Sequence, residues 1–239
     1  MLLLKRPIKW IFFDVGGTLF DDEPVYQFQE DLIFDLLADH GIDVSPEEFA
    51  KTVKTARALY LPKYPNHLIW SFTEDMERYG QVWAAYEERM EAIENEPDFR
   101  ELITPLPGIK DLLLDLRQHY NLAIVGNQPQ VVRQCLQEHH MLPLFDVHAI
   151  SAEMGLRKPD FRFYLAVLAM AHCQPSETVM VGDRVDNDIF PARALGMTTV
   201  LLKVGPHRKQ PVLSPEYLPH YTCESVHQLC KLLISEPTG

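Results

Sequence analysis

Acidic and basic side chains follow apolar runs at several separated points of this 239-residue sequence. Asp14 ends the apolar run that begins at Ile8, and Asp183 ends another run much later in the chain. Asp188 comes shortly after Asp183, and Lys158 follows a third apolar run through a short loop. Mg²⁺ prefers oxygen ligands such as carboxylates. A lysine can balance the charge where a carboxylate nucleophile meets a phosphoryl group. These residue types predict a site for Mg²⁺ and a phosphate.

Apolar runs that could form buried strands alternate with stretches whose apolar residues recur at helical spacing. The predicted strands cover residues 8–15, 122–125, 145–151, 178–181 and 198–203. The predicted helices of the same part cover residues 109–119, 129–139, 161–171, 188–195 and 225–234. Such alternation indicates an α/β fold, with a doubly wound, Rossmann-like parallel sheet covered by helices on both faces. Ligands bind beyond the carboxyl ends of strands in such sheets, which is where the acids and the lysine lie.

The long segment between the first strand and the remaining strands shows helical patterns and no convincing strand. Its first predicted helix has apolar residues on one face and ends at Gly41. The sequence from Ser45 is typical of the start of a second helix, and residues 73–93 predict a third. The expected division is therefore an all-helical cap, inserted after the first strand, and an α/β core, with the cap at 20–103 and the core at 1–19 and 104–239.

The net charge of the chain is −12, and its pI is near 5.2. Such a surface repels nucleic acid and anionic membranes, so we expect neither as a partner. The four cysteines form no metal-type pattern and predict reduced thiols. No apolar run is long enough for a signal peptide or a membrane span. We therefore expect a soluble, cytoplasmic protein, and the sequence leaves its oligomeric state open, with a homodimer as one option.

Four motifs in the core segments resemble those of the haloacid dehalogenase-like hydrolase superfamily. They are FDVGGTL at 13–19, LAIVGNQ at 122–128, GLRKPD at 155–160 and VGDRVDNDI at 181–189. KPD or GD alone would be weak, but the first and last motifs in this order, with KPD between them, are a specific combination, and the resemblance covers nearly the whole chain. It implies a Mg²⁺-dependent phosphatase that acts through an aspartyl-phosphate intermediate, with the helical insert as the cap that selects the substrate.

The resemblance also implies a role for each matching residue. Asp14 would be the nucleophile, and Lys158 would hold both the nucleophile and the phosphate. Mg²⁺ would be bound by Asp14, Asp183 and the backbone carbonyl of Gly16, and Asp188 would bind it directly or orient its water shell. The phosphate would be bound by Lys158, Asn127, Gly126 and Thr18, the last by steadying the turn around Asp14. The substrate would be a small phosphorylated metabolite, whose identity the sequence does not reveal.

Two glycines depart from the family pattern. Gly16 stands where family phosphatases usually carry a second aspartate, which protonates the leaving group and then activates water. General acid–base catalysis contributes typically ~10²–10⁴-fold, so we expect alkyl phosphates to suffer most and acyl or aryl phosphates least. Gly126 stands where the family usually has serine or threonine, and we expect Asn127 to replace part of that hydroxyl's function. Acids that follow closely, and could supply the missing group, are Asp21, Asp22 and Glu23.

Two other functions compete with the phosphatase interpretation. A catalytically weakened member of the family could bind a phosphorylated metabolite or a protein partner without turnover, and both glycine departures favour it. A haloacid dehalogenase would also lack the second aspartate, but it needs no metal, whereas the segment from Asp183 to Asp188 resembles a metal site. Replacing Gly16 by aspartate distinguishes the phosphatase from the catalytically weakened member, because the substitution should raise phosphatase activity if only the acid is missing.

Overall fold

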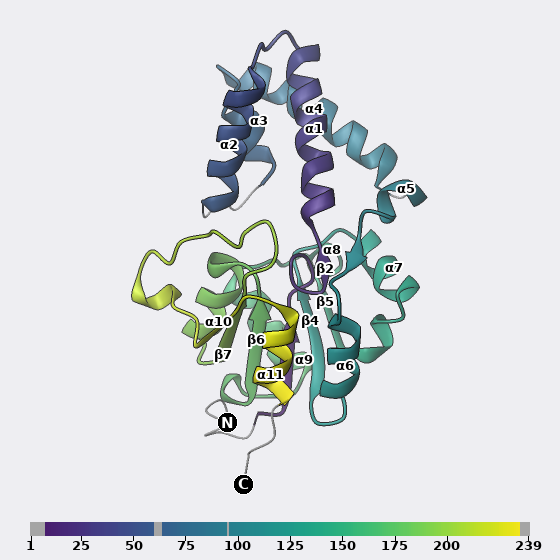
Figure 1. Ribbon diagram of the computed structural model, residues 1–239, viewed down its shortest axis with the longest axis vertical. Helices are drawn as coiled ribbons and strands as arrows, with labels where there is room; N and C mark the ends of the chain where they lie inside the picture. Colours follow the sequence, from purple (N-terminus) through teal and green to yellow (C-terminus); the bar gives the residue numbers. More distant parts are fainter. Residues whose placement is uncertain (1–7, 60–63, 95, 235–239) are drawn as a thin grey trace. The chain divides into compact units, whose positions relative to one another are not determined.

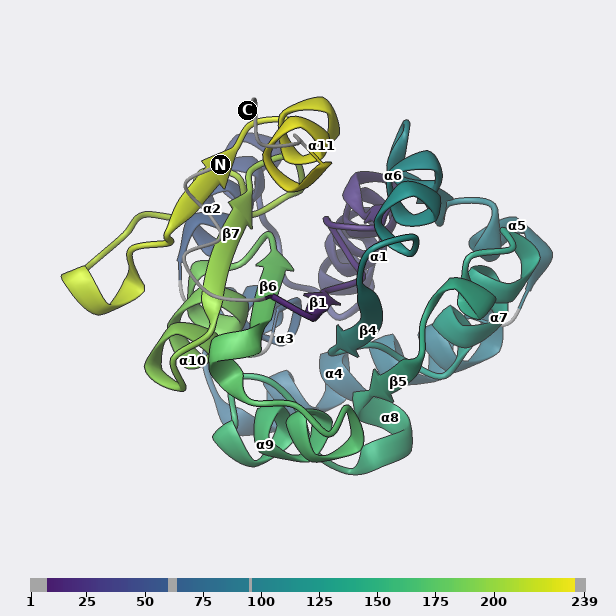
Figure 2. The same cartoon turned by 90° about the horizontal axis from the view of Figure 1, so that it is seen from below.

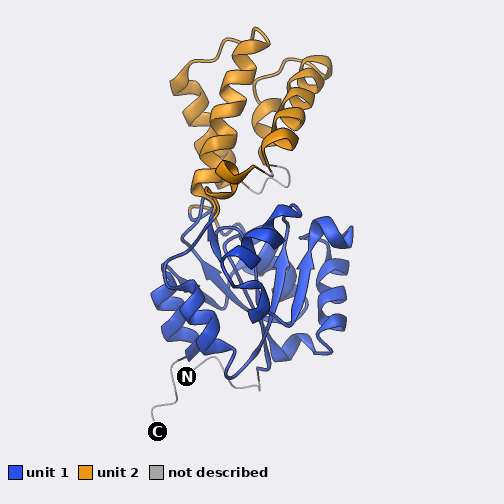
Figure 3. Ribbon diagram, turned by 90° about the vertical axis from the view of Figure 1, so that its right-hand side faces the viewer, with its two compact units in different colours: residues 1–21, 104–208, 212–239 blue, residues 22–103, 209–211 orange. Residues whose placement is uncertain are grey.

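The protein is described by a computed structural model over residues 8–59, 64–94 and 96–234. Contacts along the chain divide it into two compact units (Figure 3). The first, here called the core unit, comprises residues 1–21, 104–208 and 212–239. The second, the helical unit, comprises residues 22–103 and 209–211. Within the described residues, no helix combines the length and the apolar character that crossing a membrane requires.

A six-stranded sheet forms the centre of the core unit, in the order β5-β4-β1-β6-β7-β8. All of its neighbouring strands run parallel. The strands are β1 (Trp10–Phe13), β4 (Asn121–Gly126), β5 (Val147–Ile150), β6 (Thr178–Gly182), β7 (Thr198–Leu202) and β8 (Tyr221–Cys223). The first strand of the chain thus lies between two strands that follow it much later (Figure 1). The doubly wound parallel sheet predicted from the sequence is confirmed.

Helices cover both faces of this sheet. They are α6 (Ile109–Leu116), α7 (Val131–Glu138), α8 (Ser151–Met154), α9 (Phe161–Met170), α10 (Phe190–Ala194) and α11 (Val226–Ile234). Figure 2 shows α9 and α10 on one side of the sheet and α6 and α11 on the other. Sheets enclosed in this way need strands that are apolar on both faces, and Ile11, Phe12 and Phe13 of β1 are fully buried. Burying each such side chain stabilises the fold by about 1.5–3 kcal/mol.

Short elements of the core unit differ from the sequence prediction. A two-residue strand, β2 (Phe20–Asp21), pairs antiparallel with β3 (Thr104–Pro105) where the chain leaves the core and returns to it. No strand was expected at β2 or at the edge strand β8, because two or three residues carry no readable periodicity. Residues 185–189, expected to enter an α-helix at 188, form a π-helical turn, η3 (Val185–Ile189), directly before α10. Three short 3₁₀ turns complete the unit: η1 (Leu142–Leu144), η2 (Pro175–Glu177) and η4 (Pro215–Tyr217).

Helices alone form the regular structure of the described part of the helical unit. They are α1 (Glu23–Asp39), α2 (Pro46–Ala58), α3 (Asn66–Trp70), α4 (Met76–Ile93) and α5 (Pro97–Arg100). Ser45 caps α2 by accepting a hydrogen bond from the backbone N–H of Glu48 at 3.2 Å, as the sequence predicts. Their buried faces meet in a separate apolar cluster that includes Ile33, Leu37 and Leu68. The helical unit therefore has a hydrophobic core of its own.

A buried ion pair links the first two helices of the helical unit. Glu30 is 3% exposed, and the Arg57 guanidinium donates to both of its carboxylate oxygens, Nε at 2.7 Å and Nη2 at 2.8 Å. The Tyr64 hydroxyl also donates to Glu30, and Arg57 forms a second ion pair with Glu23. Bidentate pairs of this kind fix geometry as well as charge. They hold the start of α1 against the end of α2.

Candidate active site

The candidate site lies at the carboxyl ends of three neighbouring strands. The residues that pair across β4, β1 and β6 include Ile124, Phe13 and Val181, so the three strand ends are level. Asp14 follows Phe13 directly, and its backbone N–H donates to the carbonyl of Val181 at 2.9 Å. Strand β6 continues for one residue beyond Val181, to Gly182, and Asp183 follows directly. Level strand ends in a parallel sheet place side chains from distant parts of the chain at one edge.

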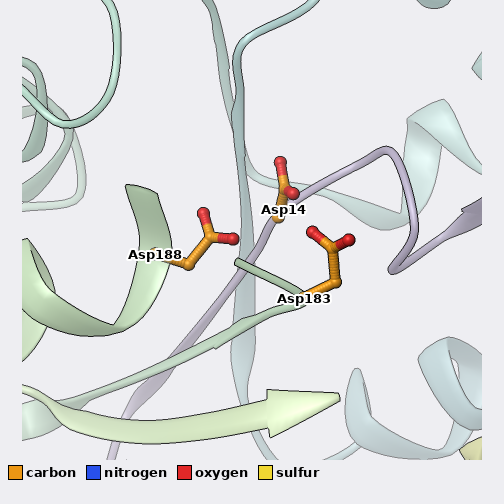
Figure 4. Close-up of side chains that lie close together, drawn as sticks. All are labelled: Asp14, Asp183 and Asp188. Carbon is orange, nitrogen blue, oxygen red and sulfur yellow. The ribbon is translucent and has the colours of Figure 1, made fainter. Parts of the chain in front are cut away.

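Three carboxylates converge at that edge (Figure 4). Asp14, Asp183 and Asp188 are 6%, 3% and 0% exposed, and each offers an oxygen within 4.8 Å of the other two. Buried like charges at such separations repel strongly. The arrangement therefore needs cations to balance it.

Lys158 supplies one of the balancing charges. Its Nζ lies 2.5 Å from Asp14 Oδ1 and 2.6 Å from Asp188 Oδ1, and the residue is 3% exposed. Burial works to lower the pKa of Lys158, but the charges of Asp14 and Asp188 and their hydrogen bonds outweigh burial and raise it. The ammonium therefore stays charged and bridges the first acid of the site to the last.

The carboxylates of the cluster also act on one another. Burial, and then the charge of Asp14, raise the pKa of Asp188 to about 7, although Lys158 and the Arg184 backbone N–H act in the opposite direction. Burial is the larger cause of that shift, and the neighbouring carboxylate adds to it. Three carboxylates that each offer an oxygen within 4.8 Å of the other two provide the ligands that Mg²⁺ prefers, so the composition of the cluster fits a hard divalent cation such as Mg²⁺.

Glycines let backbone segments approach these acids closely. Gly17 has a φ of +62°, and a Cβ there would collide with the carboxylate of Asp183. A Cβ on Gly205 would lie 2.9 Å from the Gly17 Cα and 3.1 Å from Asp183 Oδ2. Gly205 lies in the loop that follows β7, a segment to which the sequence analysis gave no role. The signal for it was a glycine just beyond the carboxyl end of a predicted core strand.

Val15 occupies the space beside Gly126. A Cβ at position 126 would lie 2.9 Å from Val15 Cγ2 and 3.2 Å from Gln128 Cγ. Real Cβ atoms essentially never approach a neighbour as closely as the first of these distances. Packing therefore accounts for the glycine at position 126 in this chain, because the side chain of Val15 fills the volume that a serine or threonine side chain would enter.

The amide of Asn127 binds the backbone of Lys158. Its Oδ1 accepts from the Lys158 N–H at 2.7 Å, and its Nδ2 donates to the Lys158 carbonyl at 2.8 Å. Asn127 was expected from the sequence to donate to a phosphate, and one N–H of its Nδ2 remains for that purpose. The two observed bonds fix the segment that carries the lysine.

Thr18 has a buried hydroxyl with no hydrogen-bond partner among the described residues. Its backbone takes part in the turn after β1, where the carbonyl of Val15 accepts from the N–H groups of Thr18, Leu19 and Phe20. The turn that presents Asp14 is thus held by its own backbone.

Of the nearby acids considered as substitutes for the missing one, Glu23 is already paired with Arg57.

The structure therefore brings together the four charged residues predicted from the sequence. Asp14, Lys158, Asp183 and Asp188 form one buried cluster. Carboxylates held beside a lysine can attack an electrophile, hold a divalent cation and bind an anion such as phosphate.

Comparisons with known proteins agree with this arrangement. A family model for haloacid dehalogenase-like hydrolases matches residues 8–196. The pyrimidine 5′-nucleotidase YjjG of Escherichia coli is 30% identical over 235 residues, which cover 94% of this chain and 97% of that protein. The glyceraldehyde 3-phosphate phosphatase of Methanocaldococcus jannaschii is 37% identical over 243 residues, which cover 95% of this chain and 97% of the relative.

Solved structures agree on the fold. The crystal structure of a haloacid dehalogenase-superfamily phosphatase from Thermococcus onnurineus superimposes with a TM-score of 0.64 at 24% identity, covering 96% of this chain and 99% of that one. The family model spans β1 to the end of α10 and so includes all four charged residues of the cluster. The chain belongs to the haloacid dehalogenase-like hydrolases.

Proposed function

We propose that this hydrolase is a Mg²⁺-dependent phosphatase of small phosphorylated metabolites, which acts through an aspartyl-phosphate on Asp14. The observation that carries the proposal is the buried cluster in which Lys158 Nζ bridges Asp14 and Asp188 at 2.5 and 2.6 Å beside Asp183. A lysine placed in this way sets a positive charge beside the attacking carboxylate and the phosphoryl group that it would meet. Relatives named as phosphatases of small metabolites support the same reaction class.

The reaction proceeds in two displacements. An oxygen of Asp14 forms a bond to phosphorus while the bond from phosphorus to the leaving-group oxygen breaks, and the leaving group takes its proton from water. Water then attacks the phosphorus, which releases inorganic phosphate and restores the Asp14 carboxylate. Lys158 stays bound to Asp14 Oδ1 and offers its charge to the phosphoryl oxygens.

The metal site is assigned to Asp14, Asp183 and the backbone carbonyl of Gly16, with Asp188 beside them. Mg²⁺ held there would neutralise charge on the phosphoryl oxygens and orient them. Both oxygens of Asp188 already accept hydrogen bonds, from Lys158 Nζ and from the Arg184 N–H at 3.0 Å. We therefore assign Asp188 to orienting the metal's surroundings and Asp14 and Asp183 to direct contact.

The substrate preference follows from Gly16, which provides no acid to protonate a leaving group. We expect acetyl phosphate and aryl phosphates to be hydrolysed faster than alkyl phosphates, by up to the ~10²–10⁴-fold typical of general acid catalysis. The helical unit, which is the cap of this proposal, is assigned to substrate selection. Its separate hydrophobic core suits a unit that can vary without disturbing the sheet.

The test measures Mg²⁺-dependent hydrolysis of acetyl phosphate, p-nitrophenyl phosphate and glycerol 2-phosphate. Turnover of the first two that disappears in Asp14→Asn supports the proposal, and Gly16→Asp should raise turnover of glycerol 2-phosphate most. Asp14→Asn has nearly the same shape, so it is a matched control for the nucleophile. Wild-type turnover that equals the Asp14→Asn background would contradict the proposal and favour a protein that binds phosphorylated ligands without hydrolysing them, a role that the packing of Val15 against Gly126 would suit.

A further inference from the structure

A buried tyrosine lies beneath the acidic cluster. Tyr164 of α9 is fully buried in the apolar layer that also contains Phe12 and Met180 of the sheet. Its hydroxyl donates a hydrogen bond of 2.5 Å to the backbone carbonyl of Asn187. Tyr164 does not belong to the set of residues that would touch substrate or metal. A buried hydroxyl aimed at one particular carbonyl nevertheless calls for an explanation.

The Asn187 carbonyl lies where the helical ladder lacks a donor. In an α-helix, this carbonyl would accept from the N–H of the residue four positions later. That residue is Pro191, which has no N–H. The chain is also irregular here, because the N–H groups of Asp188 and Ile189 both donate to the carbonyl of Arg184 within η3. The Tyr164 hydroxyl supplies the donor that Pro191 cannot supply.

The same turn carries Asp188. Its carboxylate meets Lys158 Nζ at 2.6 Å through Oδ1 and the Arg184 N–H at 3.0 Å through Oδ2. It also packs so tightly against β6 that a Cβ at Gly182 would collide with it. A small shift of the turn would therefore move this carboxylate relative to both Lys158 and Asp14.

We propose that the Tyr164 hydroxyl is a positioning group, which holds the π-helical turn through the Asn187 carbonyl and thereby sets the place of Asp188 in the metal site. The inference rests on the proposed function, because it concerns the same acidic cluster. It adds a residue outside that cluster on which metal affinity depends. Groups that orient metal-site residues from behind typically change metal affinity 10–100-fold when they are lost.

The Tyr164 hydroxyl is held in its protonated form, in which it can donate a hydrogen bond. Burial, and then the charges of Asp188, Asp14 and Asp186, raise the pKa of this phenol well above its usual value. The hydroxyl therefore stays protonated and neutral, and its contribution is a fixed hydrogen bond. No proton transfer is assigned to it.

The first experiment compares Mg²⁺ binding by the wild-type chain and by Tyr164→Phe, using isothermal titration calorimetry with no substrate present. Phenylalanine keeps the ring in the apolar layer and removes only the hydroxyl, so we expect the fold to persist and the Mg²⁺ dissociation constant to rise about tenfold. Tyr86→Phe is the matched control, because it removes a hydroxyl from a tyrosine that is 5% exposed in the helical unit. We expect Tyr86→Phe to leave Mg²⁺ affinity unchanged. An unchanged affinity in Tyr164→Phe would overturn the inference.

A rescue experiment tests the path through the carbonyl. Pro191→Ala restores a backbone N–H four residues after Asn187, so the double variant Tyr164→Phe/Pro191→Ala should regain most of the lost Mg²⁺ affinity. A merely structural loss of the hydroxyl would not be repaired by a new backbone donor at that position. A loss of affinity that Pro191→Ala leaves unrepaired would overturn the assignment to the Asn187 carbonyl.

The two readouts separate this inference from the proposed function. A wild-type chain that binds Mg²⁺ but hydrolyses no phosphate contradicts the function, while the comparison with Tyr164→Phe still decides the inference. If the wild-type chain is a phosphatase and Tyr164→Phe binds Mg²⁺ with the same affinity, the proposed function stands and the inference is overturned. A wild-type chain that does not bind Mg²⁺ overturns both.

Discussion

Val15 and Gly126 form a pair in which the size of one residue sets the size of the other. Gly126→Ser would bring back the residue type usual at this position in the family, but its Cβ would lie 2.9 Å from Val15 Cγ2. Overpacking of this kind typically costs about 1–3 kcal/mol, so we expect the free energy of unfolding to fall by that amount. Urea denaturation of Gly126→Ser measures it.

The control is the double variant Gly126→Ser/Val15→Ala. Val15→Ala removes the methyl groups that the new side chain would meet, so the serine should cost less in this background than in the wild-type chain. Residues in contact give coupling energies of about 0.5–3 kcal/mol in such cycles. Strictly additive effects of the two substitutions would show that Val15 does not decide whether position 126 can carry a side chain.

Asn127 shows how a residue can position another residue of the site. Both polar ends of its amide bind the backbone of Lys158, at 2.7 and 2.8 Å. The amide thereby ties the end of β4 to the segment that carries the lysine, although the two lie 31 residues apart in the chain. Type and order of residues indicated that Asn127 belongs to the site, whereas its partner could be learned only from the folded backbone.

At the scale of elements, the edge strand β8 is joined to β7 by an unusual set of bonds. His220, just before β8, accepts through Nδ1 from the N–H and the hydroxyl of Thr199, at 3.1 and 2.9 Å. Its own backbone N–H donates to the Thr199 hydroxyl at 3.1 Å. Burial, and then the charge of Arg193, lower the pKa of His220. The neutral imidazole is therefore the form that fits the sheet edge.

This arrangement predicts a pH dependence of stability. The folded protein holds a proton on His220 less readily than the unfolded chain does. In the unfolded chain the pKa of a histidine is about 6.5. Its contribution to stability is therefore complete above about pH 6.5 and is lost as the pH falls through the lower folded-state pKa. Urea denaturation between pH 5 and 7.5 measures the slope. His220→Asn, whose amide oxygen can accept from Thr199 but does not titrate, should reduce the fall; an equal fall in both proteins would contradict the assignment.

Sequence reasoning located the elements that are long and buried, and it missed those that depend on neighbours. Strand β1 was readable because a strand between two parallel neighbours must be apolar on both faces. Strand β8 was not, because it has only three residues, of which Cys223 alone is buried, and it owes its place to bonds such as those of His220. The last two residues of the turn η3, from Asp188, were expected to be α-helical, since neither the missing donor at Pro191 nor the hydroxyl of Tyr164 is visible in a local pattern.

At the scale of the whole molecule, the carboxylates of the proposed metal site and the second hydrophobic core belong to different units. Asp14, Asp183 and Asp188 lie in the core unit, whereas the helical unit is held by its own apolar cluster and by the buried pair of Glu30 and Arg57. A ligand stabilises only what must stay folded to bind it. Mg²⁺ should therefore act on the two units differently.

Hydrogen exchange with and without Mg²⁺ tests this division. A ligand at 100 times its dissociation constant stabilises the binding-competent state by about 2.7 kcal/mol, so amides of β1, β6 and η3 should exchange more slowly when Mg²⁺ is present. Amides of α2 and α4 should exchange at nearly the same rate, because local opening of those helices leaves the carboxylates in place. Asp183→Asn is the control, since it keeps the side-chain shape and removes one of the charges that attract the ion, and in this variant the protection of β1 and β6 should shrink. Equal protection of the helical unit by Mg²⁺ would mean that the two units open together, and protection that survives in Asp183→Asn would place the ion elsewhere.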